Sequence, residues 1–188
     1  AGAAKNILGT FTPPKEVVIS TQVLTTLDEQ DVRSGVGEML KVHAIDGSAA
    51  FSKITEDYDK LFTEANLLMD YIRRSLNIKK TYIETDEFDR GPRNVFNYGH
   101  SFGHAIEVAT DFAVPHGIAV TLGMDMANYI SGEIGFGDPA LHADRHGILK
   151  RNFRNFEEYP VPIEAFLSAI SKDKKNIGSE LMLILPTE

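Results

Sequence analysis

The chain has 188 residues, a formal net charge of −8 and no cysteine. Its length suits one domain with a core of its own and leaves little room for a second. The lack of cysteine excludes disulfides and thiolate ligands, so a transition-metal site must use His, Asp or Glu. The acidic balance argues against general nucleic-acid binding, and no apolar run approaches the roughly 20 residues of a membrane span.

The N-terminal residues, AGAAKNILG, carry no basic region followed by an apolar stretch, so we predict no signal peptide and expect a cytoplasmic protein. The first residue is not Met, which suggests a fragment of a longer protein. Residues 1–20 predict a loop with a turn at Pro13 and Pro14, followed by a short β-branched strand over 17–20. The chain offers few other strands, so we expect the sheet of this strand to lie in preceding sequence.

From Asp28 onward the spacing of apolar residues becomes helical, with Ser34 as a candidate cap of the first helix. Helices are predicted over 31–43, 59–76, 99–111, 117–134, 138–153 and 162–171. A closing apolar run over 181–185 predicts an edge strand. The sequence therefore predicts a single, mainly α domain with one or two short strands.

The densest group of polar residues lies in the stretch 97–107, NYGHSFGHAIE. On a helix, four of its polar residues share one face: Asn97, His100, His104 and Glu107. Two glycines four residues apart allow another backbone or a ligand to approach closely. Each glycine weakens a helix by about 1 kcal/mol relative to Ala, which indicates a local requirement.

Two further residues complete a candidate metal site. His116 lies in a turn that leads into the next helix and can point back toward the previous one, and Glu38 follows two glycines, Gly35 and Gly37, near a helix start. Two imidazoles and one carboxylate suit a catalytic zinc whose remaining positions go to water or substrate. Spacing does not choose between His100 and His104, because histidines four residues apart on a helix can both bind one metal.

Plainer interpretations compete with each of these residues. A single helical histidine is usually a hydrogen-bonded structural residue, and Glu38 with Lys41 could simply form a helical ion pair. His142 and His146 have the same i, i+4 spacing, and we interpret them as a solvated face. The 97–107 stretch differs from that pair because it aligns Asn, two His and Glu with two glycines.

Basic residues flank the histidine helix and suggest an anionic, oxygen-rich substrate. Lys79 precedes it, and Arg93 lies four residues before Asn97, where a guanidinium could bind a carboxylate with two hydrogen bonds. Residues 172–175, KDKK, form a basic turn whose plain interpretation is a solvated turn.

These motifs together resemble the 3-dehydroquinate synthase family. The resemblance rests on residues 97–107, on Pro-His-Gly at 115–117, on GEMLK at 37–41, on KNILG at 5–9 and on DKK at 173–175. It covers essentially the whole chain in the same order. It implies a helical metal- and substrate-binding domain over 1–188, in which 1–27 connect to an NAD-binding domain that is missing from this chain.

The resemblance also implies a role for individual residues. It assigns Zn²⁺, or Co²⁺, to Glu38, His100 and His116, and moves His104 to the substrate. The remaining catalytic positions that it implies are Lys41, Lys79, Arg93 and Asn97. Substrate or phosphate contacts fall on Asn6, Asp89, Lys174 and Lys175, and contacts to the adenine end of NAD fall on Thr26 and Leu27.

The implied activity is that of the shikimate pathway enzyme, a redox-neutral cyclisation of 3-deoxy-D-arabino-heptulosonate 7-phosphate to 3-dehydroquinate with loss of phosphate, which uses NAD and a metal. The implied full-length enzyme is a homodimer, and the fragment alone is expected to be inactive. Asp89 stands where the family usually has Glu, and the first residues read AGAA instead of the usual loop. The alternatives are a cyclase that makes inosose or valiolone rings, a related polyol dehydrogenase, or a non-catalytic helical metal-binding module. Arg93 favours a substrate with a carboxylate.

Overall fold

Helices account for all the regular structure in the described residues, which are 12, 15–88, 91–172 and 181–187 of the computed structural model. In chain order the elements are η1 (Thr21–Thr26), α1 (Glu29–Asp46), α2 (Ser48–Glu56), η2 (Tyr58–Phe62), α3 (Ala65–Thr85), η3 (Pro92–Asn97), α4 (His100–Ala109), α5 (His116–Glu133), α6 (Ala140–Phe153), η4 (Arg154–Phe156) and α7 (Ile163–Ser171). The mainly α prediction is therefore confirmed.

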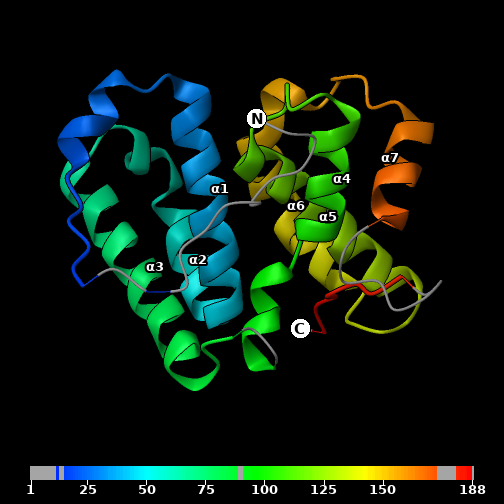
Figure 1. The fold of residues 1–188 in the computed structure, drawn as a ribbon, viewed down its shortest axis with the longest axis horizontal. Helices are drawn as coiled ribbons and strands as arrows, with labels where there is room; N and C mark the ends of the chain where they lie inside the picture. Colours follow the sequence, from blue (N-terminus) through cyan, green and yellow to red (C-terminus); the bar gives the residue numbers. More distant parts are fainter. Residues whose placement is uncertain (1–11, 13–14, 89–90, 173–180, 188) are drawn as a thin grey trace.

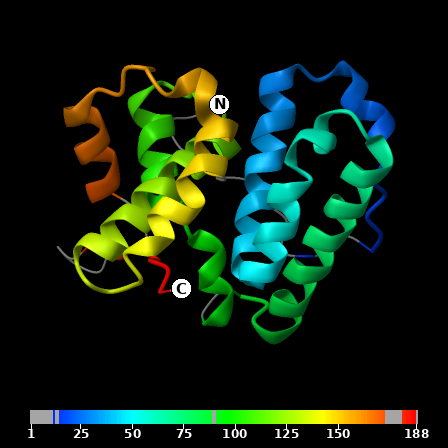
Figure 2. The ribbon, with the colours of Figure 1, turned by 180° about the vertical axis from the view of Figure 1, so that it is seen from behind.

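The helices form two groups that meet where α1 packs against α5. Figure 1 shows α1, α2 and α3 in one group and α4, α5, α6 and α7 in the other, and the view from behind in Figure 2 shows the same division. A single hydrophobic core runs through both groups, from Leu40 and Leu61 to Ile118 and Leu149. The junction of α1 with α5 is thus an interior contact, and the candidate site lies along it.

Helix α1 begins at a side-chain cap. Asp28 accepts a hydrogen bond of 2.9 Å from the backbone N–H of Asp31, and the acidic first turn suits the helix dipole. The helix ends at Gly47, whose φ of 118° is disfavoured for other residues. The prediction that Ser34 caps this helix is wrong, because Ser34 lies inside α1 and its hydroxyl bonds to α5.

The predicted helices appear with shifted ends. The single helix expected over 59–76 is divided into η2 and α3, with a break before Ala65. Helix α2, only nine residues long, was not predicted, because it is short and follows the break at Gly47. The spacing of apolar residues indicates where a helix lies better than it indicates the residues at which that helix begins and ends.

Neither predicted strand is present among the described residues. The edge strand over 181–185 is wrong, whereas the sheet of 17–20 was expected in preceding sequence and stays a prediction. Val17 and Val18 in the first segment are 68% and 84% exposed. The second segment, 181–187, runs over the loop between α5 and α6. It is held there because Ser131 donates to the carbonyl of Pro186 and the N–H of Asp138 donates to that of Thr187. Within the described part of the chain, no helix has the length and apolar character needed to cross a membrane.

Candidate metal centre

Helices α1 and α5 touch backbone to backbone at a pair of glycines. A Cβ on Gly117 would lie 1.8 Å from the carbonyl oxygen of Ser34, and one on Gly37 would lie 2.3 Å from the carbonyl oxygen of Gly117. The Ser34 hydroxyl also accepts a hydrogen bond of 2.8 Å from the N–H of Gly117, in the first turn of α5. Because Glu38 follows Gly37 and His116 precedes Gly117, this crossing sets the two side chains beside each other.

Helices α4 and α5 cross at a second glycine contact. A Cβ on Gly123 would lie 2.1 Å from the carbonyl oxygen of Gly99 and 2.8 Å from the backbone nitrogen of Gly103. Gly99 has a φ of 75°, so it separates the preceding 3-10 turn from α4, which begins at His100. The close crossing lays the histidine-bearing turns of α4 along the first turns of α5.

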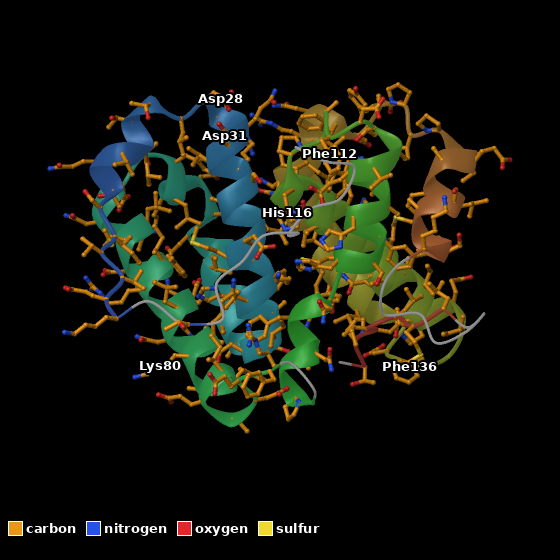
Figure 3. All side chains as sticks on the ribbon, viewed as in Figure 1. Asp28, Asp31, Lys80, Phe112, His116 and Phe136 are labelled. Atoms are coloured by element: carbon orange, nitrogen blue, oxygen red, sulfur yellow. The ribbon has the colours of Figure 1, made fainter. Side chains whose placement is uncertain are left out.

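The loop between α4 and α5 returns the chain over α4. Asp111 and Phe112 take φ values of 50° and 62°, which are uncommon for residues other than glycine. The N–H of Phe112 donates to the carbonyl of Glu107 at 2.7 Å and closes the end of α4. His116, predicted to point back toward the previous helix, lies between α1 and the pair of α4 and α5 (Figure 3).

Three side chains converge on one space between these helices. The Glu38 carboxylate oxygen Oε1 lies 3.7 Å from Nε2 of His100 and 3.6 Å from Nε2 of His116. Ligand atoms around a tetrahedral zinc lie roughly 3.3 Å apart. The structure therefore brings Glu38, His100 and His116 to near-ligand spacing from three different helices.

The far ring nitrogens of both histidines are engaged, which fixes the direction of the near ones. Nδ1 of His116 lies 3.0 Å from Glu107 Oε2, and Nδ1 of His100 lies 3.3 Å from the carbonyl oxygen of Tyr98. A carboxylate or carbonyl behind the imidazole is the usual support of a metal-binding histidine. Glu107 is 2% exposed, and its supporting role was not predicted, although its place on the polar face was the available signal. The donor set fits a zinc-class metal.

Two lysines surround the Glu38 carboxylate. Lys41, only 2% exposed, donates to both its oxygens at 3.1 and 3.0 Å and lies 3.3 Å from His100 Nε2. Lys79 Nζ lies 3.7 Å from Glu38 Oε2. The ion pair of Glu38 with Lys41 is thus present, and the same carboxylate also faces the two histidines.

Burial and neighbouring charges shift the pKa values of His100, His116 and Glu38 in different directions. Burial and then the Lys41 ammonium lower the pKa of His100 to about 3, which keeps that imidazole neutral. The hydrogen bonds to Glu107 and to Glu38 raise the pKa of His116 to about 9. Burial alone raises the pKa of Glu38, but the hydrogen bond with His116 and the charge of Lys41 hold it well below its ordinary value. At neutral pH the Glu38 carboxylate is therefore ionised and His116 carries a proton, which a bound cation would displace.

His104 remains close to the same space. Its ring centroid lies 5.2 Å from that of His100 and 5.6 Å, stacked, from that of His116. Nitrogen atoms of the three rings all lie within 4.8 Å of one another. His104 is exposed. The choice between His100 and His104 as ligand stays a prediction, which the 3.7 Å separation of His100 Nε2 from Glu38 supports.

The structure divides the polar face that was expected over 97–107. Asn97 is the last residue of η3 and does not belong to α4, because the left-handed conformation of Gly99 separates the two helices. Its side chain donates to that of Asn94 at 3.2 Å. Arg93, also in η3, donates from Nη1 to the carbonyl of Glu87 at 2.7 Å. Both residues lie on the segment that leads into α4, and their substrate contacts stay predictions.

The remaining expected site residues are spread more widely. Leu27 lines an open pocket of about 460 Å³ with Arg33, Phe62 and Arg154, while the Thr26 hydroxyl donates to a backbone carbonyl in η1. Four expected contacts lie outside the described residues: Asn6, Asp89, Lys174 and Lys175.

Comparisons with known proteins identify relatives over nearly the whole chain. The family model described as "3-dehydroquinate synthase C-terminal" matches residues 35–176. The 3-dehydroquinate synthase of Dictyoglomus thermophilum is 35% identical over 192 residues, which cover 98% of this chain and 52% of the relative. That of Alkaliphilus metalliredigens is 34% identical over 184 residues, covering 97% and 52%. The chain thus spans about half the length of these relatives.

A solved structure shares the fold. The crystal structure of 2-deoxy-scyllo-inosose synthase superposes with a TM-score of 0.74 over 98% of this chain and 50% of that one, at 23% identity. At this identity the similarity concerns the fold alone.

Proposed function

This chain belongs to the 3-dehydroquinate synthase family and matches the C-terminal domain of its members. We therefore propose that it is the metal- and substrate-binding part of a 3-dehydroquinate synthase. The proposed reaction is the cyclisation of 3-deoxy-D-arabino-heptulosonate 7-phosphate to 3-dehydroquinate with loss of phosphate. The observation that carries the metal site is the convergence of Glu38, His100 and His116 on one space with supported imidazoles.

In this proposal Glu38 and Nε2 of His100 and His116 hold a zinc-class cation. When bound, such a cation lowers the pKa of a coordinated hydroxyl and polarises a carbonyl. NAD would carry the hydride, while the protein supplies position and charge. Leu27, beside the open pocket at the start of α1, and Thr26 are the proposed contacts of its adenine end.

The chain's own residues would orient the substrate. The Lys41 ammonium, buried beside Glu38, can donate to a substrate oxygen next to the metal ligands. The exposed imidazole of His104 would exchange a proton with a substrate hydroxyl beside the metal ligands. The Arg93 guanidinium and the Lys79 ammonium would bind the substrate carboxylate, and Asn97 would donate to a ring hydroxyl. Asn6, Asp89, Lys174 and Lys175 remain the proposed contacts on the phosphate side.

Zinc binding by the chain itself tests the metal half of this proposal. Equilibrium dialysis should give a site that weakens at least tenfold in His100→Ala, His116→Ala and Glu38→Gln, whereas His104→Ala should keep it. If His104→Ala removed the metal and His100→Ala did not, the ligand assignment would be wrong. If none of these variants changed binding, the metal centre itself would be refuted.

A chimera tests the reaction. Because the chain spans about half of its relatives, it can replace the corresponding half of the Dictyoglomus thermophilum enzyme. We expect phosphate release from the heptulosonate phosphate, and a loss of more than 100-fold in Arg93→Ala. Activity on glucose 6-phosphate or sedoheptulose 7-phosphate, without activity on the heptulosonate phosphate, would instead assign the chain to another sugar-phosphate cyclase. A chimera that folds and binds zinc but turns over none of the three would support a non-catalytic module.

A further inference from the structure

A second group of metal-binding side chains lies away from the Glu38 site, between α5 and α6. His142 and His146 are four residues apart on α6 and therefore share one face. Both turn toward Asp125 on α5, so the interpretation of this pair as a plain solvated face does not describe the structure. Oδ1 of Asp125 lies 3.3 Å from Nε2 of His142, and both Asp125 oxygens lie 3.0 Å from Nδ1 of His146.

The spacing of this group is that of metal ligands. One ligand atom from each of the three residues lies within 4.8 Å of the other two, and two of the separations are close to the roughly 3.3 Å edge of a tetrahedral zinc site. The side chains of Asp125, His142 and His146 are 16%, 31% and 40% exposed. A cation could therefore enter from solvent and complete its shell with water.

The neighbouring side chains are compatible with a bound cation. The ring of Tyr129 meets that of His142 edge-on with centroids 5.4 Å apart, which holds the imidazole in place. Two basic side chains on α6 have close contacts elsewhere, since Arg145 lies over the Phe51 ring at 5.1 Å and Lys150 pairs with Glu157, although Lys150 also feels the charge of Asp125. Two imidazoles thus face one carboxylate, and this set of two nitrogen donors and one oxygen donor suits a zinc-class divalent cation.

This group is separate from the Glu38 site. Asp125 lies nine positions beyond His116 on α5, which corresponds to roughly 13 Å along the helix axis. The first group joins α1, α4 and α5, whereas the second joins only α5 to α6. We propose that Asp125, His142 and His146 bind a second zinc-class divalent cation, which fastens α6 to the helix that carries His116.

Zinc stoichiometry of the whole, tag-free chain tests this proposal. Dialysis against ZnCl₂ should give two equivalents for the wild type and one for Asp125→Asn or His142→Ala. Asp144→Asn, an exposed charge change on α6 outside the group, is the matched control and should keep two. His100→Ala should also bind one equivalent, and His100→Ala combined with His142→Ala should bind none.

The thermal midpoint gives a second readout. In the His100→Ala background, zinc should raise the Tm through the remaining site, and adding His142→Ala should remove that rise. If His142→Ala does not fold by circular dichroism, His142→Gln replaces it. The proposal would be overturned if the wild type bound one equivalent of zinc and Asp125→Asn still bound it. It would also be overturned if a second equivalent of zinc bound and none of these substitutions removed it. If instead the Glu38 site did not bind zinc, His100→Ala would bind as much zinc as the wild type.

Discussion

Adding a methyl group at Gly37 should destabilise the protein, whereas the same change two residues earlier, at Gly35, should stabilise it. Both residues lie inside α1, so each substitution removes the helix cost of glycine, about 1 kcal/mol. A Cβ on Gly35 meets nothing within 4 Å, but one on Gly37 would lie 2.3 Å from the carbonyl oxygen of Gly117. The helices would have to separate by about 1 Å to reach normal contact.

The difference between the two variants isolates the steric cost. Because the helix-propensity gain is common to both, Gly35→Ala and Gly37→Ala should differ by the overpacking cost, about 1–3 kcal/mol. Urea denaturation monitored by circular dichroism measures the two free energies of unfolding. Separation of α1 from α5 should also weaken zinc binding in Gly37→Ala alone, since the 3.6 Å approach of Glu38 to His116 depends on that crossing. Equal shifts of the same sign in both variants would refute the close glycine crossing as the origin of the site.

Three further predictions follow from buried polar groups. Glu107→Gln removes the charge behind His116 and should weaken zinc binding about 10–100-fold in a competition titration with a chromophoric chelator; unchanged affinity would refute its supporting role. Burial lowers the pKa of His43, so the folded state disfavours its protonation, and stability should be lost as the pH falls below about 6.5. His43→Phe should reduce the loss of unfolding free energy measured between pH 7.5 and 5, and an identical loss in both proteins would contradict this assignment. Tyr98→Phe removes the hydroxyl that donates to the buried side chain of Asn128 and should cost about 1–3 kcal/mol in urea denaturation, so an unchanged midpoint would contradict that role.

The sequence predicted a helix well where the helix is buried over several turns. Helix α5 is apolar over most of its length, and the expected span of 117–134 differs by one residue at each end from His116–Glu133. Predictions from the local sequence were wrong where contacts between residues far apart in the chain determine the secondary structure. An apolar run such as 181–185 predicts a strand, but a strand forms only beside a partner. The break between η2 and α3 likewise has no signal in apolar spacing.

The site was predictable as a set of residue types, and less so as an arrangement. The run of histidines and glycines predicted a metal-competent face, and resemblance to a family supplied an assignment of ligands. The contact of Gly37 with Gly117 joins residues 80 positions apart, and no local pattern reveals it. The pairing of His142 with Asp125 was missed for the same reason, because its acidic partner comes from a neighbouring helix.

The position of a bound metal tests the central claim most directly. Crystals of the chain grown with ZnCl₂ and measured at the zinc absorption edge would locate the ion by its anomalous scattering. We expect a peak within about 2.0–2.2 Å of one Glu38 oxygen and of Nε2 of both His100 and His116, with His104 outside the ligand shell. A peak bound by His104 in place of His100, or no peak between these helices at full zinc loading, would contradict it.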